Sequence, residues 1–276
     1  LHEFVLDLGN TEDERVLLLM HAWIDYADST SNLAASQSGL ALVPPYLQVQ
    51  DKSGQWVTVL SRMGFPAGLP KPMTVDLTGK FLSPSRKVKI VTNMRIHWDQ
   101  ILVESSPART DFRTARLAPS VADLQFQGFP EFSSPDGRLP PTYDYSNRSQ
   151  VAQWKTHVGA YTRYGDVRPL LAQIDDFFVI TRSGDEIEAW FDVGSLPSLP
   201  AGWTRDYLVF VDGFGKDMDV NSAASDYVGP LPFHGMSSFP YPAEQQYPNS
   251  DRYRDYMKTW NTRLVEEWIP PLRSRQ

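Results

Sequence analysis

Cysteine is absent from this chain of 276 residues. Its absence excludes disulfide bonds, thiolate zinc sites and a cysteine nucleophile. A basic block is also missing, since 26 Lys and Arg residues are outnumbered by 33 Asp and Glu residues and the net charge is −7. Nucleic acids and anionic membrane surfaces are bound by clustered positive charge, so we expect neither as a partner.

No apolar run reaches the ~18–20 residues that a membrane-spanning helix needs. The chain also lacks the HExxH, GxSxG, P-loop and dinucleotide-binding patterns, so none of these enzyme classes is indicated. Hydrophobic residues make up 41% of the chain and aromatic residues 12%, which predicts a folded protein with a substantial core. Because the chain begins at Leu1 rather than Met, we expect a processed or excised piece of a longer polypeptide.

Short strand-like segments occupy residues 1–105. Two of them flank Asp51-Lys52-Ser53-Gly54, a pattern typical of a β-hairpin. Arg15–Tyr26 is almost continuously apolar and predicts a strand buried on both faces, whereas the serine-rich residues 27–39 predict a long loop. Six to eight such strands would form a β-sandwich, of the jelly-roll or galactose-binding-like type.

Residues 106–120 have no apolar periodicity and predict a linker to a second sandwich, of immunoglobulin-like type, over 121–228. Within it, Phe129–Ser149 is rich in Pro, Gly, Ser and Tyr, which predicts a long irregular segment. Phe177–Thr181 and Ile187–Phe191, separated by a turn at Gly184, predict a hairpin.

Residues 229–276 begin as an extended strap in which prolines alternate with aromatic residues. Ser250 is placed to cap a helix that would run to Trp268 and end before Pro270. The predicted apolar stripe of this helix is Tyr253, Tyr256, Met257, Trp260, Leu264 and Trp268. The predicted fold class is therefore all-β: two β-sandwich domains, an irregular C-terminal strap and one helix.

Trp203–Asn221 carries the strongest chemical pattern. Tyr207–Val211 has the composition of a buried strand, and it leads into an acidic, glycine-containing loop. The oxygen-bearing residues of this loop suit Ca²⁺, and they are Asp212, Asp217, Asp219 and Asn221. The loop departs from the EF-hand pattern, because Ser222 and Val228 replace its glycine and its bidentate glutamate. A solvated turn, with carboxylates accepting backbone N–H bonds, is the other interpretation.

Aromatic residues adjoin carboxylates at two other places. Trp23, Asp25 and Tyr26 end one predicted strand, and Trp98 and Asp99 precede another. Aromatic faces and carboxylates bind sugars by stacking and hydrogen bonding, which makes these five residues a candidate ligand site. In the other interpretation both tryptophans fill the sandwich core. His21 is expected as a core or edge residue, while His97 and His234 fit either a polar site or a structural role.

Long phrases of the chain resemble one protein group. They are LVPPYLQVQDKSGQWVTV (42–59), MGFPAGLPKPMTVDLTGKF (63–81), YTRYGDVRPLL (161–171), LPAGWTRDYLVFVDGFGKDMDVN (199–221), PLPFHGMSSFPYP (230–242) and WNTR (260–263). They are similar to the C-terminal region of large bacterial proteins that carry FG-GAP-type propeller repeats, often with ASPIC/UnbV-type or tetratricopeptide segments. The resemblance implies an exported accessory region, periplasmic, cell-surface or secreted, beside an adhesion-like propeller. It brings no catalytic residues with it.

The expected function is that of a non-catalytic module that docks on the rest of its own polypeptide and presents a surface to a glycan or a protein. The alternative is a polysaccharide-active enzyme that uses carboxylates as acid and base. Such an enzyme needs two carboxyl groups ~5–9.5 Å apart in a cleft. A shallow aromatic platform would favour the binding module instead.

Overall fold

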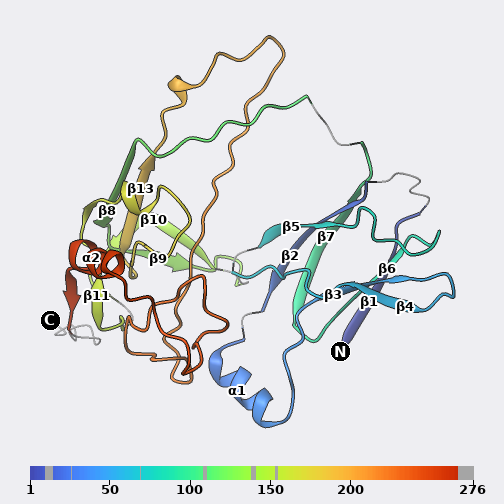
Figure 1. Ribbon diagram of the computed structural model, residues 1–276, viewed down its shortest axis with the longest axis horizontal. Coiled ribbons are helices and arrows are strands. Elements are labelled where there is room, and N and C mark those ends of the chain that lie inside the picture. The colour runs from blue at the N-terminus through green and yellow to red at the C-terminus, as the bar shows by residue number, and fades with distance from the viewer. Residues whose placement is uncertain are drawn as a thin grey trace. The chain divides into compact units, whose positions relative to one another are not determined.

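The computed structural model describes residues 1–9, 15–25, 27–68, 70–107, 111–137, 141–152 and 155–266. The chain forms two compact units, Leu1–Arg113 and Thr114–Gln276, and the division falls inside the predicted linker. Most of the regular structure is sheet (Figure 1), so the predicted all-β class is confirmed. The residues of the predicted second domain, strap and helix all lie in the second unit.

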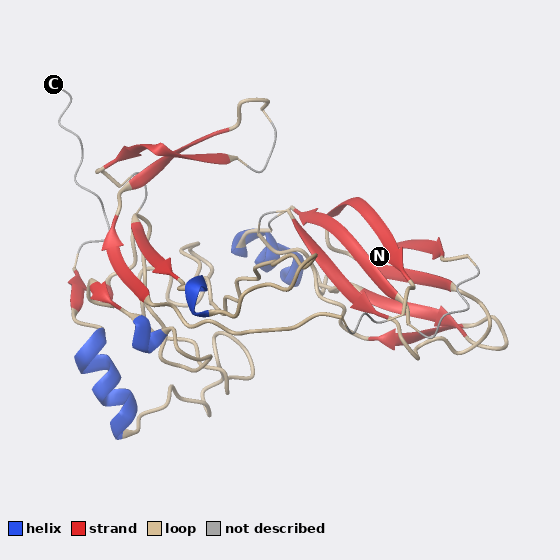
Figure 2. Cartoon of the chain, turned by 90° about the horizontal axis from the view of Figure 1, so that it is seen from above, coloured by secondary structure: helices blue, strands red, loops and turns tan. Residues whose placement is uncertain are grey.

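The first unit is a sandwich of two antiparallel sheets, drawn with its strands in red in Figure 2. One sheet has the order β1-β6-β3-β4 and the other β5-β2-β7. The strands are β1 (His2–Asp7), β2 (Leu17–Ile24), β3 (Tyr46–Gln50), β4 (Trp56–Leu60), β5 (Lys71–Asp76), β6 (Lys87–Thr92) and β7 (Ile96–Glu104). Which type of sandwich this is stays a prediction.

One apolar core lies between these sheets, because alternate residues of each strand point inward. Its buried members are Val16, Leu18, Met20, Leu47, Val49, Val75, Leu77, Val88 and Ile90. The predicted hairpin is confirmed as β3–β4: Asp51 accepts backbone N–H bonds from Ser53 and Gln55, and Gly54 has a φ of 81°. The prediction that β2 is buried on both faces is wrong, since its burial alternates along the strand.

The predicted loop at residues 27–39 is instead a helix, α1 (Ser29–Gln37). The Asp28 carboxylate caps it by accepting a hydrogen bond of 2.6 Å from the Ser31 backbone N–H. None of its residues is buried, so the apolar periodicity that identifies most helices is missing here. The prediction of a single helix is therefore wrong.

The second unit contains small sheets joined by long irregular segments. A three-stranded sheet has the order β12-β8-β13, and two further pairs are β9–β10 and β11–β14. Its elements are β8 (Val121–Phe126), β9 (Phe129–Ser133), β10 (Thr142–Ser149), β11 (Gly159–Tyr161), β12 (Gly165–Asp166), η1 (Arg168–Leu170), β13 (Asp185–Trp190), η2 (Val193–Ser195), α2 (Asp251–Trp260) and β14 (Arg263–Val265).

Two predictions for residues 129–191 are wrong. Phe129–Ser149 contains the β9–β10 hairpin, in which Phe132 and Tyr143 are cross-strand partners. Residues 177–181 form no strand, and β13 pairs with β8 instead. The turn at Gly184 connects to the end of β8, because its carbonyl accepts N–H bonds from Gln127 and Gly128.

The strap of residues 229–249 is irregular, as predicted, and its rings pack on one another and on α2. Tyr247 lies 6.2 Å from Phe233 and 5.5 Å from Tyr253, measured between ring centroids. Helix α2 ends at Trp260 rather than continuing to Trp268. The chain turns at Asn261 and enters β14, which pairs with β11. Trp268 and Pro270 lie outside the described residues.

The predicted buried strand at Tyr207–Val211 is wrong. These five residues form no strand, and each of their side chains is exposed. Neither described helix has the length and hydrophobicity needed to cross a membrane.

Candidate functional site

The outer face of β2 and β7 gathers most of the predicted ligand residues. The inward residues of β2 include Met20, Ala22 and Ile24, all of them buried. Side chains alternate along a strand, so His21, Trp23 and Asp25 lie on the opposite, outer face.

The register of β7 brings a second polar set beside the first. Trp23 is paired directly with His97. The pairing shifts between His21 and Ala22, where Asp99 is an extra residue on β7. This bulge places the Asp99 carboxylate 3.3 Å from the His21 Nδ1 atom. We define the β2/β7 face by its side chains: His21, Trp23, Asp25, Arg95, His97 and Asp99.

Ring stacking and ion pairs hold the centre of the β2/β7 face. The rings of Trp23 and His97 stack with centroids 5.2 Å apart and an interplanar angle of 27°. The Asp25 carboxylate lies 2.9 Å from the Arg95 guanidinium and 3.4 Å from the His97 Nε2 atom. Burial is the largest single influence on the pKa of Asp25 and raises it. The hydrogen bonds and charges of Arg95 and His97 together outweigh burial and hold that pKa below its usual value.

One of the predicted ligand residues, Trp98, does not join this face. Trp98 packs against the core of the sandwich and meets Phe4 edge to face, with ring centroids 5.6 Å apart. The core interpretation is therefore correct for Trp98 and wrong for Trp23. Tyr26 lies outside the described residues.

His21 and Arg95 are the members of the β2/β7 face that no sequence pattern indicated, whereas His97 was expected either in a polar site or in a structural role. Metal-type spacing is the wrong signal for them, since they lie on different strands. Positions 21, 23 and 25 alternate, as do 95, 97 and 99, and this spacing could have shown that each set shares one face. Their meeting depends on the β2–β7 register, which no local pattern specifies.

The acidic loop does not bring its four predicted metal ligands together. The Asp217 carboxylate accepts the Asp219 backbone N–H at 3.0 Å, and the Asp219 carboxylate accepts that of Asn221 at 3.2 Å. Asp212 instead contacts His234. Within the described parts of the chain no group of three His, Asp or Glu side chains could hold a metal ion. Calcium binding stays a prediction.

His234 links two carboxylates in the second unit. Its Nδ1 atom lies 2.7 Å from Asp176, and its Nε2 atom lies 3.0 Å from Asp212. The Asp176 carboxylate also accepts the Tyr253 hydroxyl at 2.9 Å. Hydrogen bonds to Asp212 and Asp176 raise the pKa of His234. Burial, and then the bond to Asp176, raise the pKa of Tyr253 to about 12. We call this set the His234 bridge.

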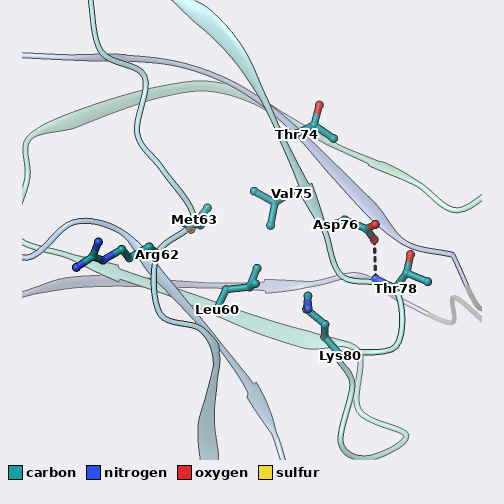
Figure 3. Close-up of a pocket in the computed structure, with 8 residues that line it drawn as sticks. All are labelled: Leu60, Arg62, Met63, Thr74, Val75, Asp76, Thr78 and Lys80. Atoms are coloured by element: carbon teal, nitrogen blue, oxygen red, sulfur yellow. Dashed lines mark hydrogen bonds between the residues drawn. The ribbon is translucent and has the colours of Figure 1, made fainter. Parts of the chain in front are cut away.

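A hollow of about 370 Å³ lies in the first unit beside the edge strands β4 and β5 (Figure 3). Leu60, Met63 and Val75 form its apolar part, with Arg62 and Lys80 on opposite sides of it. Asp76 is the one carboxylate in its lining, and it accepts the Thr78 backbone N–H at 2.8 Å. The pair of facing carboxylates that a glycosidase requires is therefore not formed by the lining of this hollow.

Comparison with family models, curated proteins and solved structures finds no match to this chain. The resemblance to the C-terminal region of FG-GAP-type proteins therefore stays a prediction.

Proposed function

We propose that the chain is a non-catalytic binding module of a larger exported protein of the FG-GAP type, and that its β2/β7 face binds a glycan. One observation carries this proposal: Trp23, Asp25 and Asp99, predicted as ligand residues, share one open sheet face with two imidazoles. Docking on the rest of its own polypeptide would use other surfaces of the chain.

The chemistry of the β2/β7 face suits a sugar. The half-buried indole of Trp23 offers an apolar ring on which a pyranose can stack. Asp99, whose carboxylate is 80% exposed, can accept hydrogen bonds from sugar hydroxyls, and the neighbouring imidazole of His21 can donate or accept. Stacking gives affinity for many sugars, while the placement of the polar groups selects among their hydroxyl patterns.

A glycan array of bacterial and host polysaccharides, run on the whole chain, tests this proposal. We expect binding to at least one class of glycan. Trp23→Ala should weaken binding at least tenfold through loss of stacking, and Asp99→Asn should weaken it severalfold. Tyr145→Ala is the control, because Tyr145 is an exposed aromatic residue of the second unit outside the β2/β7 face.

Asp99→Asn should leave the fold intact, since its carboxylate is solvated. Binding unaffected by both Trp23→Ala and Asp99→Asn would contradict the proposal, as would an array without any bound glycan. A hydrolysis screen of the same polysaccharides tests the alternative of a carboxylate-dependent enzyme. Release of reducing ends by the wild-type chain would decide for that alternative.

A further inference from the structure

Tyr207–Val211 is a strand-like segment that has no strand partner in the described part of the chain. Its side chains are between 62% and 99% exposed, although Tyr, Leu, Val, Phe and Val are the residues of a buried strand. None of the five forms a hydrogen bond with any residue that the structure describes. Such a row of free backbone groups and apolar side chains is a template for pairing with a sheet edge.

The same unit offers an open edge. Strand β13 ends the β12-β8-β13 order, and β8 is its one neighbour among the described strands. The later half of β13 is solvent-exposed, and it includes Ala189 and Trp190. An incoming apolar strand would find cross-strand partners there, because aromatic and β-branched side chains pair well across a ladder.

The segment belongs to an arm whose base is fastened. Residues 191–212 leave the end of β13 and return as two extended limbs (Figure 1). Within the arm, the Arg205 guanidinium donates to the Pro197 carbonyl at 2.9 Å. Asp212, which directly follows the segment, is held by the His234 bridge. The segment therefore lies between a contact within the arm and the His234 bridge.

We propose that Tyr207–Val211 pairs with the open edge of β13 in a second copy of this chain. Each copy carries both the donor segment and the acceptor edge, so reciprocal pairing closes into a symmetric dimer. Each exposed side chain of this size offers on the order of 100 Å². Two donor segments together offer about 1,000 Å² of side-chain surface to the contact, close to the area that a specific interface should exceed. The inference is independent of the proposed glycan site, which lies in the first unit.

Light scattering coupled to size exclusion, on the full chain over a range of concentrations, tests the proposal. We expect a dimer whose dissociation constant rises at least tenfold in Val209→Lys. Because Val209 is solvent-exposed, this change should not disturb the folded monomer. Leu199→Lys, at an exposed apolar residue of the same arm outside the segment, is the control and should leave the dimer unchanged.

Cysteine cross-linking locates the contact, and the chain contains no cysteine of its own to interfere. Val209→Cys mixed with Ala189→Cys should give a disulfide-linked heterodimer under mild oxidation. Hydrogen exchange should show Leu208–Val211 protected in the dimer and unprotected in Val209→Lys. A monomer at every concentration, protection of the segment within a monomer, open-ended fibres, or a dimer unaffected by Val209→Lys would each overturn the proposal.

Discussion

The two units of this protein are held together in different ways. The first has a single buried apolar cluster between two sheets, to which β2, β3, β5 and β6 all contribute. The second has two small clusters, one around Leu124 and one around Tyr256, with Val179 and Trp260 packed against both. Many of its irregular segments are fastened by a polar side chain that reaches across the unit.

The two units therefore show two ways in which a chain is held in one conformation. Ladder hydrogen bonds and a continuous core distribute stability over many residues, so that each strand supports its neighbours. A segment without a ladder must satisfy its backbone groups one at a time. In the second unit, for example, the Tyr256 hydroxyl donates to the Phe178 carbonyl and Arg263 donates to that of Thr162. We therefore expect polar substitutions to matter most in the second unit and apolar ones in the first.

The largest effect is expected for Arg263→Leu. The Arg263 guanidinium lies 2.6 Å from the Asp185 carboxylate, and the two side chains are 14% and 0% exposed. The substitution leaves a buried carboxylate without its cation, at a cost of about 3–5 kcal/mol in the free energy of unfolding. Hydrogen exchange should show that the backbone amides of β8 and β13 lose protection, while those of the sandwich in the first unit keep it.

The control for this prediction is Arg168→Leu, which removes one partner of the exposed Arg168–Asp166 pair. We expect a change below about 1 kcal/mol there. Equal effects of the two substitutions would show that buried polar contacts carry no special weight in the second unit.

Leu18→Ala is the corresponding change in the first unit. Leu18 is fully buried in the core, so the substitution should lower the free energy of unfolding by roughly 2–5 kcal/mol through lost contacts and a residual cavity. Leu19→Ala is the matched control, because Leu19 lies on the outer face and is 37% exposed. Denaturant unfolding should separate the two variants. If hydrogen exchange showed that Leu18→Ala also lowers the protection of backbone amides in the second unit, the two units would not be independent in stability.

Tyr256→Phe should cost about 1 kcal/mol, since it removes one hydrogen bond to a backbone carbonyl. Burial raises the pKa of Tyr256 from 10.0 to about 12. The folded state therefore holds this proton more tightly, and the associated stability is present below pH ~10 and is lost as the pH rises toward ~12. Melting curves in that range should fall less steeply for Tyr256→Phe than for the wild type. Tyr207→Phe, at an exposed tyrosine, should not change the slope.

The smallest effect is expected at the His234 bridge, because its histidine is 45% exposed and solvent weakens its ion pairs. The raised pKa of His234 gives stability that is present below its ordinary value of 6.5 and lost as the pH rises through the folded pKa. Burial acts to raise the pKa of Asp176, but the bonds from His234 and Tyr253 outweigh it and lower that pKa. That part of the stability is lost as the pH falls through the lowered pKa, which is below 3.8.

Melting temperatures of the wild type and His234→Gln should therefore differ most between about pH 4 and 6.5 and converge in alkaline buffer. His2→Gln, at an exposed histidine near the chain start, controls for the loss of a titrating side chain. A difference that grows with pH would rule out the bridge as a source of stability.

The sandwich could be predicted because its signals are local. The turn at Asp51–Gly54 and the short apolar strands each depend on neighbouring residues. In this unit one segment predicted as a loop is a helix, α1. This helix has no buried face, and such a helix leaves no periodic apolar pattern in the sequence. The second unit was predicted less well, because Phe177–Thr181 and Tyr207–Val211 have strand composition but no ladder partner among the residues that the structure describes.

The candidate site was predictable only in part. Aromatic–carboxylate pairs identified Trp23, Asp25 and Asp99, yet the same criterion also selected Trp98, which packs in the core. Spacing could assign residues to a strand face, but it could not supply the bulge at Asp99 or the cross-strand partner of Trp23. The His234 bridge joins His234 to carboxylates 22 and 58 positions away in irregular segments, and no sequence rule connects those residues.

Lys216 follows the exposed segment and the glycines of the acidic loop. Its ammonium group donates to three consecutive backbone carbonyls, those of Tyr227, Val228 and Gly229. Burial lowers the pKa of this amine. The carbonyls converge on it as they would on a bound metal ion, but this cation is covalently tethered to the chain. A chelator can therefore not extract it, whereas acylation of the amine would remove the charge and two of its three N–H donors at once.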